Sequence, residues 1–127
     1  MAVVLETKQD TVKQLDVWFV DLGEQPGSIQ RGLRPVVVIS NDRSNQYSNF
    51  VMVSPISSQI QKAKLPTHVV LKSGECGVAK DSVAMFEQHI SITKDQLKYK
   101  LFELPEKYER EVERAIEVST SRRFSRK

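Results

Sequence analysis

The sequence has 127 residues, of which 39% are hydrophobic and 28% are charged, with a net charge of +3. This composition is typical of one ordinary domain that can bury a core without staples, and it excludes a disordered chain or a fibrous repeat. No apolar run approaches the roughly 20 residues that cross a bilayer, and no signal peptide is visible, so we expect a cytoplasmic protein that avoids membranes. Cys76 is the only cysteine, which excludes an internal disulfide and a cysteine-built zinc site within one chain.

Short strands separated by turn signals fill most of the chain. Residues 15–22 (LDVWFVDL) are rich in β-branched and aromatic residues and lead into a turn-prone loop, GEQPGSIQRG. The run 35–40 (PVVVIS) is almost continuously apolar and is followed by Asn-Asp, which predicts a strand buried on both faces. Three further strands are expected at 50–56, 67–71 and 82–92. Their short spacing is typical of a small barrel or a tightly curled sheet, and not of alternating β-α units.

One helix is expected at 105–119. Pro105 suits a first helical position that lacks an N–H donor, and Glu106 suits the positive end of the helix dipole. Apolar residues then recur at helical spacing, so this stripe should pack on the strands; they are Tyr108, Val112, Ala115 and Ile116.

The chain shows no repeat, linker or second composition regime, so one domain, 1–127, is expected, with a β core over 15–104. The remaining residues, 120–127, form a basic tail. A solvated, frayed end explains this tail better than a dedicated RNA clamp, which stays the alternative.

Common catalytic motifs are missing: there is no phosphate-binding glycine loop, no His-Glu-x-x-His pair and no nucleophile elbow. No metal site and no cofactor are therefore expected. His68 and His89 could act as base and acid in RNA cleavage. Each lies inside a strand-like segment, however, which favours a structural role for both.

Arg34 stands directly before the buried run, in the stretch RGLRPVVVISND. An interior strand does not accommodate a guanidinium, so this side chain must lie at the rim or be paired. Two interpretations are equal on the residues alone. Arg34 forms a salt bridge at the rim with Asp42 or Glu87, or its planar fork binds a phosphate.

Four segments, DVWFVDL, GSIQRGLRPVVVISND, SPISSQIQKAKLPTHVVL and KDSVAMFEQ, resemble in order and spacing the MazF/PemK-type toxins of bacterial toxin-antitoxin pairs. The resemblance spans about residues 15–104. After EQ the chain reads HISI and lacks the arginine that the family often carries there. The resemblance implies a mainly β fold with a C-terminal helix, a compact Src-homology-like β-barrel of the plasmid-maintenance toxin type, acting as a homodimer.

The same resemblance implies an activity and a partner. The family consists of metal-independent, sequence-specific endoribonucleases that cleave single-stranded RNA, including mRNA, to a 2′,3′-cyclic phosphate and a 5′-hydroxyl. A cognate acidic antitoxin neutralises the toxin by lying over its RNA groove. The arginine thought essential for cleavage corresponds to Arg34, and the hydroxyl residue after the third strand corresponds to Ser57. Gln88 matches a position associated with RNA contact, and the loop that holds Gln30 and Arg31 shapes the groove.

The cleavage chemistry gives Arg34 and Ser57 a purpose. When the ribose 2′-hydroxyl attacks the neighbouring phosphate, negative charge accumulates on the phosphoryl oxygens, and a cation with a hydroxyl donor would lower the barrier. Because an arginine is effectively always protonated, Arg34 is expected to stabilise charge or to donate a proton to the leaving oxygen. The residues do not identify a general base.

Splayed RNA bases should stack on aromatic side chains. The candidates are Trp18, Phe19, Tyr47, Phe50 and Phe86. Most of them are expected in the core, because a barrel this small needs aromatic residues inside. Only Tyr47, with Arg43 beside it, is expected to contribute to a surface. Lys62 and Lys64 could line the backbone track, with a solvated loop as the alternative.

Two other functions remain open. A related barrel family poisons DNA gyrase through its terminal helix without any catalysis. An inactive barrel that binds RNA but does not cut it is the third possibility.

Overall fold

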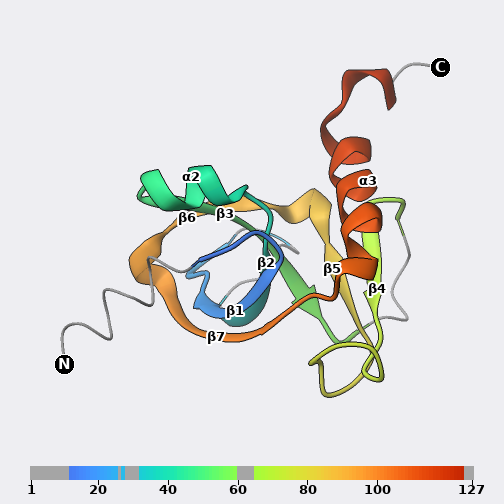
Figure 1. Cartoon of the computed structure of the whole chain (residues 1–127), viewed down its shortest axis with the longest axis horizontal. Helices are drawn as coiled ribbons and strands as arrows, with labels where there is room; N and C mark the ends of the chain where they lie inside the picture. The colour runs from blue at the N-terminus through green and yellow to red at the C-terminus, as the bar shows by residue number, and fades with distance from the viewer. Residues whose placement is uncertain (1–11, 26, 28–31, 60–64, 125–127) are drawn as a thin grey trace.

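The computed structural model describes residues 12–25, 27, 32–59 and 65–124 (Figure 1). These residues contain seven strands: β1 (Asp16–Asp21), β2 (Leu33–Val38), β3 (Phe50–Ser57), β4 (His68–Leu71), β5 (Ser82–Met85), β6 (Ile90–Thr93) and β7 (Leu97–Glu103). The described residues also contain two α-helices, α2 (Asp42–Tyr47) and α3 (Glu109–Thr120). Four short 3-10 turns accompany them: η1 (Phe86–Gln88), η2 (Lys94–Gln96), η3 (Glu106–Tyr108) and η4 (Arg122–Phe124). The expected class, mainly β with a C-terminal helix, is confirmed.

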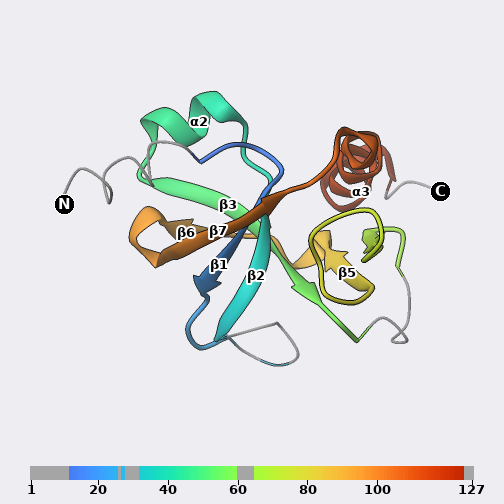
Figure 2. The same cartoon turned by 60° about the horizontal axis from the view of Figure 1, so that its bottom comes forward.

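The strands form one antiparallel sheet in the order β4-β5-β3-β2-β1-β7, and β6 also pairs with β3. Strand β3 therefore changes partner along its length: Phe50–Val53 pairs with β6, and Ile56 and Ser57 pair with β5. This exchange curls the sheet, and Figure 2 shows β5 turned away from β6 along β3. The curl is not a closed barrel, because the ladders among the described residues do not join β6 to β7.

Two apolar clusters lie on opposite faces of the central strands, because alternate side chains of a strand point to opposite faces. The cluster inside the curl includes Trp18, Val20, Val36, Val38, Val51, Val53, Ile92 and Leu97. The other includes Val17, Val37, Ile56, Leu71, Phe86, Tyr108, Val112 and Ala115. Strands β1, β2 and β3 thus supply residues to both cores, which confirms the prediction that β2 is buried on both faces.

Helix α3 covers the second cluster and stands beside β4 (Figure 1). It buries Val112 and Ala115, one turn apart on its inner side. Its α-helical part begins at Glu109, after the 3-10 turn η3, and runs to Thr120. The expected helix at 105–119 is therefore right in place, although its first turn is 3-10 and Pro105 precedes that turn.

The structure differs from the sequence analysis at three places: one predicted strand is interrupted, and two elements were not predicted. The expected strand 82–92 is interrupted by η1, where Phe86 is fully buried and its N–H bonds to the Thr67 carbonyl at 3.0 Å. Strand β7 was missed altogether. Helix α2 was also missed; the side chain of Asn41 caps it by accepting the Ser44 N–H at 2.9 Å.

Among the residues described, no helix is long and apolar enough to span a membrane.

Candidate functional site

Arg34 lies where β2 leaves the double core. Leu33 before it is 59% exposed, Arg34 and Pro35 are partly buried, and Val36 is fully buried. The ladder between β2 and β3 pairs Val36 with Pro55 and Val37 with Ser54. This ladder ends at the Val36–Pro55 pair, and Ile56 and Ser57 pair with β5, so Arg34 and Ser57 each lie two residues past the same end of the ladder. The structure therefore places the two expected catalytic residues at the same end of neighbouring strands.

A cavity of about 400 Å³ opens beside Arg34. Its apolar wall includes Val17 and Ile56 of the cluster under α3 and Leu101 and Phe102 of β7. Its polar residues are Arg34, Ser58, Lys80 and Ser82. The full lining is Val17, Arg34, Pro35, Ile56, Ser58, Gly77, Val78, Ala79, Lys80, Ser82, Leu101 and Phe102. Two basic residues and two serines thus line this space, and the Ser82 hydroxyl donates to the Lys80 carbonyl at 2.8 Å. No carboxylate is among the described residues that line it. Such a lining favours an anion with an apolar part.

Ser57, the last residue of β3, and Ser58, which follows it, differ in burial. The Ser57 hydroxyl is buried and accepts the N–H of Gln59 at 3.2 Å. Ser58 is exposed and lines the Arg34 cavity, whereas Ser57 does not. The sequence analysis did not single out Ser58, although the repeated serine in SPISSQ was a signal for it.

The loop between β4 and β5 forms one wall of this cavity through residues 77–80. Gly77 lies so close to the Phe102 ring that an added Cβ would stand 2.5 Å from it. Only a glycine permits this approach without moving the ring. Lys80 reaches the site from this wall, and sequence alone could not find it because the contact joins distant segments.

A hydrogen-bonded cluster ties the same loop to the start of the C-terminal helix. Tyr108 donates its hydroxyl to Glu75 at 2.6 Å and accepts the Lys72 N–H at 3.1 Å, and Lys107 pairs with Glu75 at 2.8 Å. The hydrogen bonds from Lys107 and Tyr108 lower the pKa of Glu75. Burial, together with the Glu75 carboxylate, raises the pKa of Tyr108 to about 12. We call this group of Lys72, Glu75, Lys107 and Tyr108 the loop latch.

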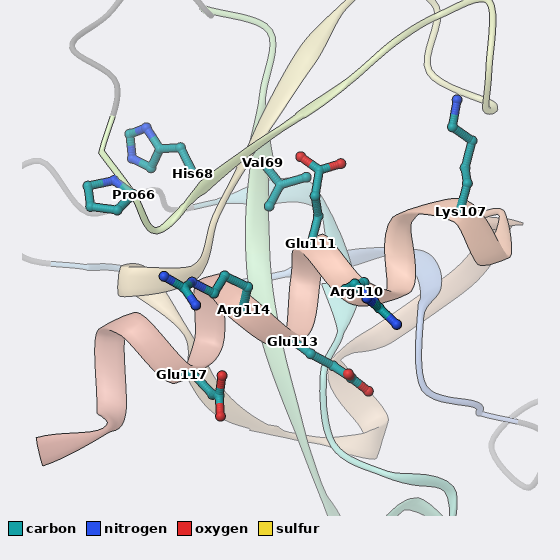
Figure 3. A pocket seen from close by; sticks show the side chains of 9 residues that line it. All are labelled: Pro66, His68, Val69, Lys107, Arg110, Glu111, Glu113, Arg114 and Glu117. Atoms are coloured by element: carbon teal, nitrogen blue, oxygen red, sulfur yellow. The ribbon is translucent and has the colours of Figure 1, made fainter. Parts of the chain in front are cut away.

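A larger cavity, of about 690 Å³, lies between β4 and α3 and not at Arg34 (Figure 3). Its helix side presents alternating charges: Lys107, Arg110 and Arg114 against Glu111, Glu113 and Glu117. Because these charges balance, this groove offers a polyanion no net attraction, and size alone does not make it the functional site.

Each histidine has its own local partners. His68 bonds to Glu87 through Nε2 at 3.0 Å, and its Nδ1 accepts the Leu65 N–H at 3.3 Å, so Nε2 carries the proton. His89 bonds through Nδ1 to the Phe86 carbonyl at 2.8 Å. Burial opposes ionisation of Glu87, but hydrogen bonds from His68 and Thr67 hold its pKa below the ordinary value. These contacts favour the structural role over the proton-shuttling pair.

The two carboxylates considered as partners of Arg34 have other contacts. Glu87 is bonded to His68 and Thr67. Asp42 begins α2, beyond the far end of β2 from Arg34, and accepts the Gln14 N–H at 2.7 Å. A rim salt bridge between Arg34 and Asp42 therefore does not fit the strand's geometry.

The other expected RNA-binding residues are dispersed. Gln88 is partly buried in η1, with Nε2 at 3.8 Å from the Met85 sulfur. Arg43 and the 78%-exposed Tyr47 belong to α2, at the opposite end of β2 from Arg34 (Figure 2). The structure does not bring these two to the Arg34 cavity. Gln30, Arg31, Lys62 and Lys64 lie outside the described residues.

The aromatic residues follow the expectation only in part. Trp18 and Phe86 are buried, but Phe50 is 55% exposed and Phe19 is only partly buried. Phe19 stacks on Tyr99, a residue that the sequence analysis missed together with its strand β7. The prediction that most of the five candidates lie in the core was therefore too broad.

Fold and site together define a small curled-sheet domain with a helix over one core and an anion-attracting cavity at one end of its central strands. The chain belongs to the family of PemK-like, MazF-like toxins of type II toxin-antitoxin systems, which its residues 13–120 match. This confirms the family that the sequence motifs indicated.

Two relatives share nearly half of their residues with this chain. Endoribonuclease MazF of Staphylococcus saprophyticus is 45% identical over 104 residues, covering 82% of this chain and 87% of its own length. Endoribonuclease EndoA of Bacillus subtilis is 44% identical over 108 residues, covering 85% and 93%.

Solved structures agree on the fold. A mycobacterial endoribonuclease in complex with its cognate antitoxin superposes with a TM-score of 0.71 at 17% identity, covering 86% of this chain and 94% of its own. A MazE–MazF structure from Deinococcus radiodurans gives a TM-score of 0.64 at 22% identity, covering 84% and 92%.

The loop latch predicts a stability difference at alkaline pH. A tyrosine ordinarily titrates near 10, and Tyr108 titrates at about 12 in the folded protein. Between these values the unfolded chain releases the phenol proton and the folded chain keeps it, so the free energy of unfolding falls as the pH rises. In Tyr108→Phe, the free energy of unfolding should fall less steeply with pH over this range. At neutral pH this variant should be less stable than the unmodified protein by about 1 to 3 kcal/mol, because the hydrogen bonds of the hydroxyl are lost.

Urea denaturation of both proteins at neutral pH and at several values from 10 to 12 measures this difference. Comparing the two proteins cancels the titration of all other groups. Identical slopes for both would show that Tyr108 does not keep its proton in the folded state.

Proposed function

We propose that this chain is an endoribonuclease toxin that cleaves single-stranded RNA at the Arg34 cavity without a metal ion. The observation that carries the proposal is the lining of this cavity, in which Arg34, Lys80 and Ser58 stand beside apolar residues and the described residues include no carboxylate. The two relatives at 44% and 45% identity are named endoribonucleases, which supports the same activity here.

In the proposed reaction the ribose 2′-oxygen forms a bond to the adjacent phosphorus while the bond to the 5′-oxygen breaks. The 2′-hydroxyl proton leaves to a base and the 5′-oxygen gains a proton, so the products are a 2′,3′-cyclic phosphate and a 5′-hydroxyl. Arg34 stabilises the charge that develops on the phosphoryl oxygens, and Lys80 adds a second cation from the loop between β4 and β5. A hydroxyl from Ser57 or Ser58 donates a further hydrogen bond.

We assign the partner by the same charges. An acidic antitoxin segment can occupy the cation-lined cavity and so exclude RNA, and the structural neighbours solved with antitoxins support such a partner. A homodimer with a cytoplasmic location completes the proposal, by analogy with the family.

Cleavage should persist in an excess of chelator. Among the described residues, no three His, Cys, Asp or Glu side chains gather in a way that could hold a metal ion, and the proposed chemistry uses only side chains. Incubation of the pure protein with a long single-stranded RNA and EDTA, followed by end analysis of the fragments, measures this.

Loss of activity in EDTA with recovery on adding magnesium would contradict the metal-free mechanism. RNA that stays intact under all conditions would instead favour the gyrase poison. RNA that binds without being cut would favour the inactive barrel.

Arg34→Ala should abolish nearly all cleavage and leave the fold intact. Arg34 lies at the rim of its strand, so its loss should cost far less than the roughly 3 to 5 kcal/mol of a broken buried ion pair. Removing one donor from a charged transition state typically costs on the order of a hundredfold in rate, and the cation should contribute more than a neutral hydroxyl. Ser57→Ala and Ser58→Ala should therefore slow cleavage less.

Single-turnover cleavage and melting curves of the three variants measure both effects. The serine that slows cleavage when replaced is the donor. An Arg34→Ala protein that cuts RNA normally, or one that unfolds, would remove Arg34 from the catalytic role.

A short acidic peptide from the cognate antitoxin should inhibit cleavage, and less so at high salt. The charges at the cavity are open to solvent and are screened beyond about 8 to 10 Å at physiological ionic strength. Titration of the peptide at low and high salt measures the inhibition constant. Salt-independent inhibition, or protection that maps to the groove between β4 and α3, would place the antitoxin elsewhere.

A further inference from the structure

A row of apolar side chains crosses three neighbouring strands beside Arg34. The register pairs Phe19 of β1 with Pro35 of β2 on one side and with Tyr99 of β7 on the other. The rings of Phe19 and Tyr99 stack with centroids 5.4 Å apart and planes inclined by 23°. Tyr99 is nevertheless 54% exposed, so Phe19 supports a ring that remains open to solvent.

This aromatic pair borders the Arg34 cavity. Pro35, which is paired with Phe19, lines that cavity, and so does Leu101, two residues beyond Tyr99 and 42% exposed. An open aromatic surface thus adjoins a space that holds Arg34 and Lys80. The two basic residues can bind a phosphate, and the exposed aromatic ring offers a planar surface on which a base can stack.

Single-stranded nucleic acid is the ligand that fits both halves of this surface. A base has a π-face whatever its identity, and stacking on an aromatic side chain contributes to affinity without requiring a particular sequence. A ring that is already held by a neighbour loses little conformational freedom on binding. A membrane or an apolar peptide would use the aromatic pair but would leave the two cations without a purpose.

We propose that Tyr99, held in place by Phe19, is the surface on which an unpaired base of the RNA stacks next to the phosphate bound at the Arg34 cavity. The inference rests on the proposed function, because it takes single-stranded RNA as the ligand. Tyr99 is a binding residue in this proposal, and the bond-breaking step does not involve it.

The test measures binding separately from cleavage. The cleavage site is first mapped on a long RNA. A series of labelled oligonucleotides of that sequence is then made, each with deoxyribose at the cleaved residue to prevent cleavage and with 2-aminopurine at one of the neighbouring positions. Fluorescence anisotropy gives the affinity, and quenching of 2-aminopurine reports stacking. Tyr99→Ala should weaken binding roughly 5- to 150-fold, the range that one base–aromatic stack supplies, and should abolish quenching at one position. Tyr99→Phe should retain both.

Phe50→Ala is the matched control. Phe50 is as exposed as Tyr99, at 55%, but it lies at the far end of β3 from Ser57, so its loss should leave binding unchanged. Melting curves of all variants confirm that each is folded.

Three outcomes would overturn the proposal. In the first, Tyr99→Ala binds RNA with unchanged affinity and quenching. In the second, Phe50→Ala weakens binding as much as Tyr99→Ala does. In the third, Tyr99→Ala leaves RNA binding unchanged and alters only the oligomeric state of the protein. The last result would make the aromatic pair a contact between copies of the chain. If no site can be mapped because RNA stays intact, anisotropy with a random-sequence single-stranded DNA pool still tests Tyr99, so failure of the nuclease activity is distinguishable from failure of the stacking surface.

Discussion

Burial of strand β2 on both faces is the constraint that organises this molecule. Val36, Val37 and Val38 are fully buried, with alternate side chains in the two cores, and β1 and β3 occupy both of its edges. No face or edge of this segment can take a guanidinium without a large desolvation cost. The first position at which a cation reaches solvent is therefore the start of the strand, where Arg34 stands. Because β3 runs antiparallel to β2, Ser57 at its end and Ser58 after it lie at the same end of the sheet as Arg34.

The other half of the cavity is built by chain that lies about 40 residues further on. Residues 77–80 line it, and the loop latch fixes them through Glu75, Lys107 and Tyr108. Because Tyr108 also belongs to the core under α3, we expect the position of this loop wall to depend on the docking of the C-terminal helix. Stability and site geometry are coupled at this point, and a change in the helix can alter a cavity that it does not touch.

The sequence predicted the structure correctly where a short run of residues had only one physically favourable environment. A continuous apolar run bounded by Pro and Asn-Asp predicted β2, and a cation before it predicted a rim position for Arg34. It was uninformative where the outcome depends on distant partners. The break at Phe86 exists because β3 exchanges β5 for β6, and neither partner can be recognised from residues 82–92. The charged strand β7 alternates poorly, so Tyr99 was missed, and Lys80 and Ser58 became visible only when the loop wall was in place.

Charges of opposite sign are separated on this surface, which the net charge of +3 does not reveal. Near the start of β1 another cavity has one basic lining residue, Lys13, and five acidic ones: Asp16, Asp42, Glu103, Glu106 and Glu109. The described residues that line the Arg34 cavity include no carboxylate. A polyanion is repelled by the first and attracted by the second, so the protein's field would orient it before contact. At physiological ionic strength each field extends only about a Debye length of 8 Å, so orientation acts on the last approach of the strand. A weakly basic protein can therefore position one phosphate without holding nucleic acid over its whole surface, which suits an enzyme that must release its products.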